Sequence, residues 1–339
     1  MAVGERDLDA ALDAVLGSGS ELAPAAAALS AAYRSGRRPG EVLDDPTAAR
    51  AYAAVRMPAT FAAVRAALRA AGPGLRPTTL LDIGGGTGAA VWAAAATLPS
   101  LRSAHVLDGS APALALGRRI AAGAPDPVLA GATWTQARWP VDLPGADLAT
   151  LAYFAGELRP EQQVAVVAAA AERAGAVAVV EPGTPAGFAD LLRARDTLLG
   201  MGFRIVAPCP HDLDCPWATG SDWCHFPARL PRSARHRQVK GARLGWEDEK
   251  FSYVVAVRDG ADRPEGRPEG WPEGWPEGWP EGRPEGRIVR HPVQRKGMVE
   301  LTVCAARPGI ERVIVSKRSG ADYRAARDAG WGDAWPPHP

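Results

Sequence analysis

Between residues 78 and 183 the chain alternates short apolar runs with alanine-rich segments, and this alternation constrains the fold more than any other feature. The short runs are typical of β-strands, and the alanine-rich segments have the length and composition of helices. We expect strands in the runs TTLLDIG, SAHVLDG, ATWTQA, ADLATLAYF and AVAVVEPG, and helices at about 88–98, 111–122 and 160–174. Strands that alternate with helices form a parallel sheet covered on both faces. The sequence therefore predicts an α/β, doubly wound, Rossmann-like fold.

The rest of the chain is organised around this core. Before it, apolar positions recur three and four residues apart and prolines interrupt them, which is typical of helices. We divide the chain into an N-terminal helical extension (1–75), the Rossmann-like core (76–200), a Cys-rich basic insertion (201–250), the last two strands of the core (251–305) and a basic C-terminal tail (306–339). The last two strands are expected at Phe251–Val257 and Met298–Ala305. The insertion would then enter between the fifth and sixth strands of the sheet.

A loop of unusual composition, at about 260–287, separates these two strands. It contains six tetrapeptides of the form Arg/Trp-Pro-Glu-Gly at residues 263–286. A proline at every fourth residue prevents helix formation and strand pairing, and the glycines add conformational freedom. We expect a turn-rich or disordered loop and assign it no function.

Composition excludes a membrane-spanning helix, because no run of 18 uninterrupted apolar residues occurs. The acidic N-terminus shows neither the basic-then-apolar pattern of a signal peptide nor an Arg- and Ser-rich transit pattern. We therefore expect a cytoplasmic protein.

A glycine-rich segment, LDIGGGTG, ends the first strand and opens the following helix. Glycines there let the backbone turn sharply and approach a ligand closely. Gly84, Gly86 and Ala89 also satisfy the dinucleotide-binding pattern G-x-G-x-x-A. A carboxylate at Asp82, however, would repel a pyrophosphate and suits the cationic amino group of S-adenosylmethionine. A glycine turn that serves packing alone, with no ligand, remains the alternative.

Further residues extend this interpretation. Asp108, at the end of the second strand, can accept hydrogen bonds from both ribose hydroxyls. The pattern D-x-G-x-G-x-G with this second acid resembles class I methyltransferases. The resemblance implies that S-adenosylmethionine would contact Asp82, Gly84, Gly86, Gly88 and Asp108.

The region after the fourth strand does not identify a reaction. Enzymes that methylate exocyclic amines usually carry Asn/Asp-Pro-Pro-aromatic there, whereas this chain reads AYFAGEL at 152–158. No cysteine lies nearby to act as the nucleophile of cytosine C5 methylation. Gln136-Ala137-Arg138, after the third strand, offers no carboxylate to the adenine amino group. Catalytic residues therefore stay unknown, with Glu157 and Tyr153 as the candidates.

Four cysteines lie in the second half of the chain with the spacing C-x5-C-x8-C-x79-C: Cys209, Cys215, Cys224 and Cys304. A cytoplasmic location disfavours disulfides, and four thiolates favour a metal site. Zinc sites normally use close C-x2–4-C pairs, which are absent. Wide, uneven spacing better suits an iron–sulfur cluster, whose irons draw thiolates from separate segments. Zinc and unliganded buried thiols remain the alternatives.

Basic residues gather in the last third of the chain, although the net charge is only +1. Residues 225–246 contain no acid, and further clusters surround Arg295 and Arg318. Such runs are costly unless they face water or a polyanion. We expect RNA contacts at Arg229, Arg232, Arg235, Arg237, Lys240, Arg243, Lys317 and Arg318. A merely solvated surface is the alternative.

Several motifs together resemble one family. They are YRS at 33–35, YAAVRMPAT at 52–60, LDIGGGTG, CPHDLDCP, DWCHF and the ending VSKRSGADYRAARDAGWGDAWP. Over residues 30–336 the chain resembles the ribosomal-small-subunit Rsm family, the methyltransferase-like assembly factor of the mitochondrial small ribosomal subunit and its bacterial homologues. The resemblance implies a [4Fe–4S] cluster on the four cysteines, binding to small-subunit rRNA, and no DNA or membrane partner. The repeat loop and Arg138 depart from the family pattern.

These observations predict an rRNA-binding, methyltransferase-like protein of small-subunit assembly that carries an iron–sulfur cluster. Whether it also transfers a methyl group to rRNA is left open. The alternative is an active methyltransferase with zinc on the four cysteines and a substrate other than rRNA.

Overall fold

The computed structural model of the chain describes residues 3–17, 19–34, 44–241, 243–258, 284–307 and 309–337. Most of the expected repeat loop lies outside these residues. Within them, no helix is both long and apolar enough to cross a membrane.

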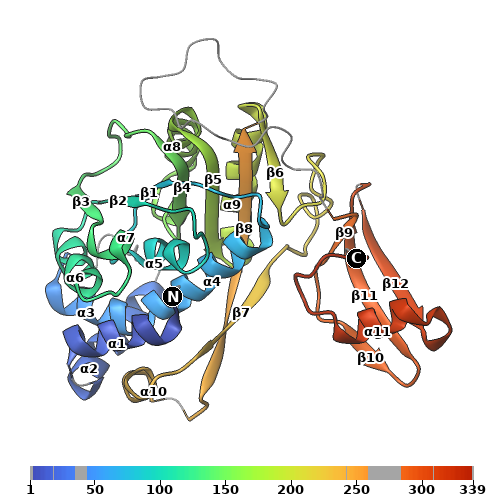
Figure 1. Cartoon of the computed structure of the whole chain (residues 1–339), viewed down its shortest axis with the longest axis horizontal. Helices are drawn as coiled ribbons and strands as arrows, with labels where there is room; N and C mark the ends of the chain where they lie inside the picture. The colour runs from blue at the N-terminus through green and yellow to red at the C-terminus, as the bar shows by residue number, and fades with distance from the viewer. Residues whose placement is uncertain are drawn as a thin grey trace.

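An eight-stranded sheet forms the centre of the fold (Figure 1). Its order is β3 (Thr133–Gln136), β2 (Ser103–Asp108), β1 (Thr79–Ile83), β4 (Ala146–Ala152), β5 (Ala174–Pro182), β8 (Trp246–Arg258) and β6 (Phe203–Ala207), with β7 (Phe226–Pro231) paired to β8. Strands β1 to β5 run parallel, and β8 is antiparallel to β5 and β6. This order, with one antiparallel strand inserted before the last, is that of class I methyltransferases. The predicted fold class is confirmed.

Helices cover both faces of the sheet (Figure 1). The helices of the core are α4 (Met57–Ala70), α5 (Ala89–Ala95), α6 (Ala111–Ala122), α7 (Pro127–Ala130), α8 (Pro160–Arg173) and α9 (Pro185–Gly200). One apolar cluster joins α4, α5 and α6 to one face, and a second joins α8 and α9 to the other. Because both faces are covered, the central strands are buried along nearly their whole length, as expected for a parallel sheet.

Three further helices precede the core, where the sequence periodicity predicts helices. They are α1 (Glu5–Leu16), α2 (Gly19–Arg34) and α3 (Pro46–Val55). Helix α2 packs against α3 and against α10 (Ala234–Lys240), so the N-terminal helices contact an element at least 200 residues away.

Strand β8 extends past the carboxyl edge of the parallel strands. Phe251 pairs with Pro182, the last residue of β5, and the residues before Phe251 pair with β7 instead. The resulting two-stranded ribbon carries α10 at its far end, beside α2 (Figure 1). The ribbon therefore overhangs the edge at which ligands of doubly wound sheets bind.

The C-terminal part forms a second, antiparallel sheet (Figure 1). It contains β9 (Gly286–Ile288), β10 (Val293–Arg295), β11 (Met298–Ala305) and β12 (Ile310–Ser316), covered by α11 (Ala321–Asp328). The expectation that Met298–Ala305 is a strand of the main sheet is therefore wrong. Residues 203–207, which we assigned to the insertion, form β6 of the main sheet instead. Alternating apolar residues predict a strand but do not specify its partner, which here is decided by packing.

Candidate functional site

The glycine loop between β1 and α5 has the conformation that its sequence requires. Gly84, Gly86 and Gly88 have positive φ angles of 67°, 52° and 82°, a region that favours glycine. The amide N–H groups of Gly84 and Gly85 donate to the Leu107 carbonyl of β2 at 2.8 and 3.1 Å. The loop is thus fixed to the end of the neighbouring strand.

A cavity of about 220 Å³ opens beside this loop, at the carboxyl edge of the sheet. Gly84, Asp108, Arg138, Phe154 and Glu157 are among its lining residues. The carboxylate of Asp108 accepts from the Gly86 amide at 2.8 Å and the Ser110 amide at 2.7 Å. Each carboxylate oxygen has a further lone pair, so Asp108 keeps acceptor capacity for a ligand hydroxyl.

Asp82 does not line this cavity. It is fully buried beneath the loop, where a Cβ on Gly85 would lie 2.4 Å from its Oδ2 atom. Its Oδ1 accepts from the Thr150 hydroxyl at 2.7 Å, and its Oδ2 has no hydrogen-bond partner in the described part of the chain. Burial, with a smaller contribution from the Asp108 charge, raises the pKa of Asp82 to about 7. The predicted contact of Asp82 with a methionine amino group stays a prediction.

The raised pKa of Asp82 makes the free energy of unfolding depend on pH. The folded state binds the proton more tightly than the unfolded state, whose ordinary pKa is 3.8. This contribution to stability is therefore complete below about pH 4 and is lost as the pH rises to about 7. At about 1.4 kcal/mol per pKa unit, the loss is on the order of 4 kcal/mol. Asp82→Asn should flatten the fall in melting temperature between pH 5 and pH 8. Exposed Asp328→Asn is the control, and an unchanged slope in Asp82→Asn would contradict the assignment.

The segment after β4 is held by an acid that the sequence analysis did not identify. Glu181, at the end of β5, is 1% exposed and accepts from the amides of Phe154 at 3.1 Å and Ala155 at 2.8 Å. Burial raises its pKa to about 8. Glu181 thereby positions Phe154 and Glu157, which both line the cavity. In the sequence, the only sign that Glu181 holds this segment is its position as an acid at the end of β5.

The two catalytic candidates have different surroundings. Glu157 faces the cavity, whereas the Tyr153 hydroxyl donates to Glu249 of the ribbon at 2.9 Å. Tyr153 has a φ of 57°, the one positive φ among the described residues other than glycine, and such strain clusters at functional sites. The structure therefore places only Glu157 at the cavity.

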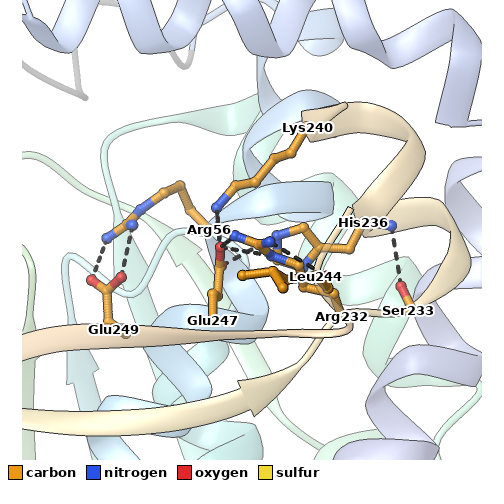
Figure 2. Close-up of polar contacts among 8 residues, drawn as sticks. All are labelled: Arg56, Arg232, Ser233, His236, Lys240, Leu244, Glu247 and Glu249. Atoms are coloured by element: carbon orange, nitrogen blue, oxygen red, sulfur yellow. Dashed lines mark hydrogen bonds and ion pairs between the residues drawn. The ribbon is translucent and has the colours of Figure 1, made fainter. Parts of the chain in front are cut away.

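An ion pair completes this contact. The Arg56 guanidinium donates to both carboxylate oxygens of Glu249, at 2.9 and 3.2 Å, and lies 5.3 Å from the centre of the Tyr153 ring. Figure 2 shows this pair, which connects the start of α4 to the ribbon. Arg56 occurs in the YAAVRMPAT motif, but the sequence alone did not show its partner.

The four cysteines converge although they come from separate segments. Cys209, Cys215 and Cys224 lie between β6 and β7, and Cys304 lies on β11 of the second sheet. All four line a single cavity, together with the apolar side chains of α9 and with Trp217. The Nε2 atom of His211 is 3.8 Å from the Cys304 sulfur. The predicted set is thus brought together by the two sheets rather than by one insertion.

The thiols share an apolar environment. Burial, and secondly the charges of the neighbouring cysteines, raise the pKa of Cys304 to about 12 and that of Cys224 well above its ordinary value. Arg195 and Arg287 line the same cavity and lower the pKa of Cys304 in part, and metal binding would add further positive charge to stabilise four thiolates. No three His, Cys, Asp or Glu side chains among the described residues are arranged around one point as ligands of a single ion. The iron–sulfur cluster predicted from the spacing of the cysteines stays a prediction.

The basic segment 225–246 is largely neutralised by Glu247 and Asp248, which directly follow it, and by Asp13 of α1. Glu247 accepts from Arg232 at 2.7 Å and Lys240 at 2.9 Å, and lies 3.3 Å from His236, as Figure 2 shows. Burial would raise the pKa of Glu247, but the hydrogen bonds from His236, Lys240 and Arg232 hold it far below its ordinary value. These cations therefore serve in part to hold α10 against the ribbon.

Two more of the predicted RNA contacts are paired in the same way. Arg229 pairs with Asp248 at 2.8 Å, and the buried Arg235 pairs with Asp13 of α1. Arg237 and Arg243 are exposed, as are Lys317 and Arg318 at the end of β12.

The chain is similar to one protein family and to several named proteins. The family described as Mitochondrial small ribosomal subunit Rsm22 matches residues 46–336. The human ribosome assembly protein METTL17, mitochondrial, is 31% identical over 306 residues, which are 84% of this chain and 62% of the relative. The Rsm22-cox11 tandem protein 2, mitochondrial, of Schizosaccharomyces pombe is 29% identical over 185 residues, 48% of this chain. The chain spans 62% of the human relative's length and 24% of the yeast relative's length.

Solved structures were also compared. An O-methyltransferase family protein of Burkholderia thailandensis has a TM-score of 0.40 and 14% identity, covering 63% of this chain and 60% of its own. The magnesium protoporphyrin IX methyltransferase of Synechocystis has a TM-score of 0.37 and 18% identity, covering 59% and 78%.

Proposed function

The chain belongs to the family of the mitochondrial small ribosomal subunit protein Rsm22. From this premise we propose that it binds small-subunit rRNA during assembly of the small ribosomal subunit. We also propose that it carries a [4Fe–4S] cluster on its four cysteines. The observation that carries the proposal is the convergence of these cysteines, from two sheets, on one cavity. The name of the human relative, a ribosome assembly protein, supports the same role. We keep the predicted cytoplasmic location as a prediction, since the relatives are named as mitochondrial proteins.

In this proposal the cluster is structural. Cys304 belongs to β11, and the other three cysteines follow β6 of the main sheet. A cluster bound by all four would join the second sheet to the core, because each thiolate would hold one iron. His211 would act as a neighbouring donor to the Cys304 sulfur rather than as a ligand.

S-adenosylmethionine is the second proposed ligand, and it would supply an activated methyl group. Asp108 would accept from the ribose hydroxyls and Gly84 would border the methionine part of the cavity. Gly86 and Gly88 would shape the loop, and buried Asp82 would support it from below. Arg138 stands where an acid would accept from the adenine amino group, so adenine would be held by backbone groups and packing. Glu157 is the side chain that we propose beside the methyl group.

An active methyltransferase with zinc on the cysteines and another substrate is the alternative. It is distinguished by iron, zinc and labile-sulfide analysis of anaerobically purified protein. About four iron and four sulfide per chain support our proposal, whereas one zinc supports the alternative.

The proposed RNA surface includes Lys317 and Arg318, which are exposed at the tip of the second sheet. The Lys317 amide donates to the Gly297 carbonyl at 3.0 Å, which places these two cations beside Arg295 and Lys296 of the β10–β11 turn. No ion pair involving these four residues forms in the described part of the chain. Arg237 and Arg243 are proposed to contribute separately, at the end of the ribbon.

Reversing both charges at this tip should weaken rRNA binding. In Lys317→Glu/Arg318→Glu, the negative slope of log affinity against log salt concentration should become less steep by about 1.4–1.8, since each of the two phosphate contacts releases about 0.7–0.9 counterion. The measurement is an equilibrium titration with small-subunit rRNA at several salt concentrations. Arg119→Glu/Arg173→Glu, at exposed sites on α6 and α8, is the matched control. An unchanged slope would mean that the tip is only a solvated surface.

A further inference from the structure

A second large cavity, of about 390 Å³, lies between the core and the C-terminal segment. Its lining comes from α4, β7, β8 and the C-terminal segment, and includes Arg69, Ala70, Phe226, Phe251, Tyr253, Trp331 and Asp333. It shares no lining residue with the cofactor cavity beside the glycine loop. Nothing in the proposed methyltransferase-like site therefore uses it.

One wall of this cavity is aromatic. The rings of Phe226, Phe251 and Tyr253 pack against one another with centroid distances of 5.2 to 6.4 Å. Trp331 contributes a fourth ring from the C-terminal segment. The first three rings are only 1–3% exposed, so they form a rigid support, whereas the Trp331 ring is partly exposed. A partly exposed ring can stack with an unpaired base of any sequence, because every base has a flat π-face.

Polar groups complete the cavity. The Arg69 side chain is exposed at α4 and forms no ion pair or hydrogen bond in the described part of the chain. Tyr253 is 3% exposed, and no hydrogen bond to its hydroxyl occurs among the described residues. The Asp333 Oδ2 atom accepts from the Gly330 amide at 2.7 Å, which leaves Oδ1 for a ligand. The cavity thus offers a cation, a hydroxyl and a carboxylate oxygen.

This combination suits a nucleotide. The volume is within the range of about 300–1,000 Å³ for small-molecule sites. A base would stack on the partly exposed Trp331 ring and direct its polar edge to Tyr253 and Asp333. Its phosphate would lie at Arg69, near the surface.

We propose that this cavity binds one unpaired nucleotide of an RNA strand. The inference rests on the proposed rRNA-binding function and adds to it a site that reads a single splayed-out base. A strand that enters the cavity continues in both directions over the surface, so the open position of Arg69 suits a phosphate in a chain.

The nucleotide cavity is joined structurally to the cysteine cavity. Phe226, Tyr253 and Arg287 line both. The Arg287 Nε atom donates to the Pro208 carbonyl, next to Cys209, at 3.1 Å, and its Nη1 atom donates to the Gly332 carbonyl at 2.9 Å. Loss of the metal would disturb both sites, so the test must use full-length protein of known metal content.

The test compares RNA binding by three variants of the full chain, purified anaerobically and matched in iron content. Ala70→Phe fills the cavity without changing the charge, Arg69→Glu reverses the proposed phosphate contact, and Arg119→Glu is the control on α6. A fluorescent single-stranded RNA of mixed sequence is titrated, and a 5-iodouridine version is photocrosslinked and mapped by mass spectrometry. Ala70→Phe should weaken binding about 5- to 150-fold, the range for one stacked base. Crosslinks should map to Phe226, Phe251, Tyr253 or Trp331.

Other outcomes overturn the inference. Unchanged affinity in Ala70→Phe and Arg69→Glu, or crosslinks confined to other segments, would exclude a nucleotide in this cavity. Free nucleoside monophosphates that bind there without competition from RNA would show a metabolite site instead. Should Ala70→Phe fail to fold, exposed Arg69→Glu decides. If RNA binding falls in Lys317→Glu/Arg318→Glu but not in Ala70→Phe or Arg69→Glu, only the nucleotide site is refuted. If the native chain binds no RNA, the proposed rRNA-binding function is refuted first.

Discussion

Cys304→Ser should abolish iron binding and destabilise the contact between the two sheets. The native chain, purified anaerobically, should be brown and contain about four iron and four sulfide, and the variant should be colourless. Binding energy at a structural metal site is folding energy. We expect a loss of about 2 kcal/mol or more, and a fall in melting temperature of roughly 5 °C or more at about 2–4 °C per kcal/mol.

The same loss is expected for serine at Cys209, Cys215 or Cys224, because all four thiols line one cavity. Thr302→Ser, on the same face of β11, changes the strand without touching the donor set and should retain iron. A native chain that contains one zinc, or a variant that keeps its iron, would refute the cluster.

Asp108→Ala should weaken S-adenosylmethionine binding by roughly 10- to 150-fold. The basis is a loss of about 1.5–3 kcal/mol, the range for hydrogen bonds to a charged group. Because Asp108 also holds the Gly86 and Ser110 amides, Asp108→Asn is needed beside it. The asparagine keeps one acceptor oxygen for the loop amides. Asp108→Asn should therefore lose affinity for S-adenosylmethionine but change the melting temperature less than Asp108→Ala does. Calorimetry with iron-loaded protein measures both variants.

The control is Glu172→Ala, an exposed acid on α8, which should bind the cofactor normally. No heat from the native chain at millimolar S-adenosylmethionine would mean that the glycine loop serves architecture alone. If binding is observed, methyl transfer to small-subunit rRNA that disappears in Asp108→Ala would establish an enzyme. Binding without transfer would leave an assembly factor.

The ribbon does not decide this choice. Arg56, Tyr153 and Glu249 connect α4, the end of β4 and β8 across the carboxyl edge of the sheet. None of these three residues lines the cofactor cavity, so the contact fixes the ribbon beside the cavity without closing it. The transfer experiment decides between an enzyme and an assembly factor.

Local sequence determined much of this protein. The strand runs, the glycines at positive φ and the proline-started helix at Pro160 are recognisable because they depend on the conformational preferences of neighbouring residues. The parallel arrangement of β1 to β5 follows from the alternation of strands with helices. The four cysteines also stand out by type, since the chain has no others.

Only the tertiary structure decided which distant residues meet. The sequence of β11 predicts a strand, but packing placed it, and Cys304 with it, in a second sheet. The segment 225–246 contains no acid, yet Asp13, Glu247 and Asp248 neutralise four of its cations. Asp82 has the position of a ligand contact in the motif, but burial placed it beneath the loop. Local preferences act within a few residues, whereas charge pairing and burial depend on how the elements pack. The pairing of β7 with β8 brings Glu247 and Asp248 to their partners, and Arg235 meets Asp13 across 222 residues of chain, which no local pattern specifies.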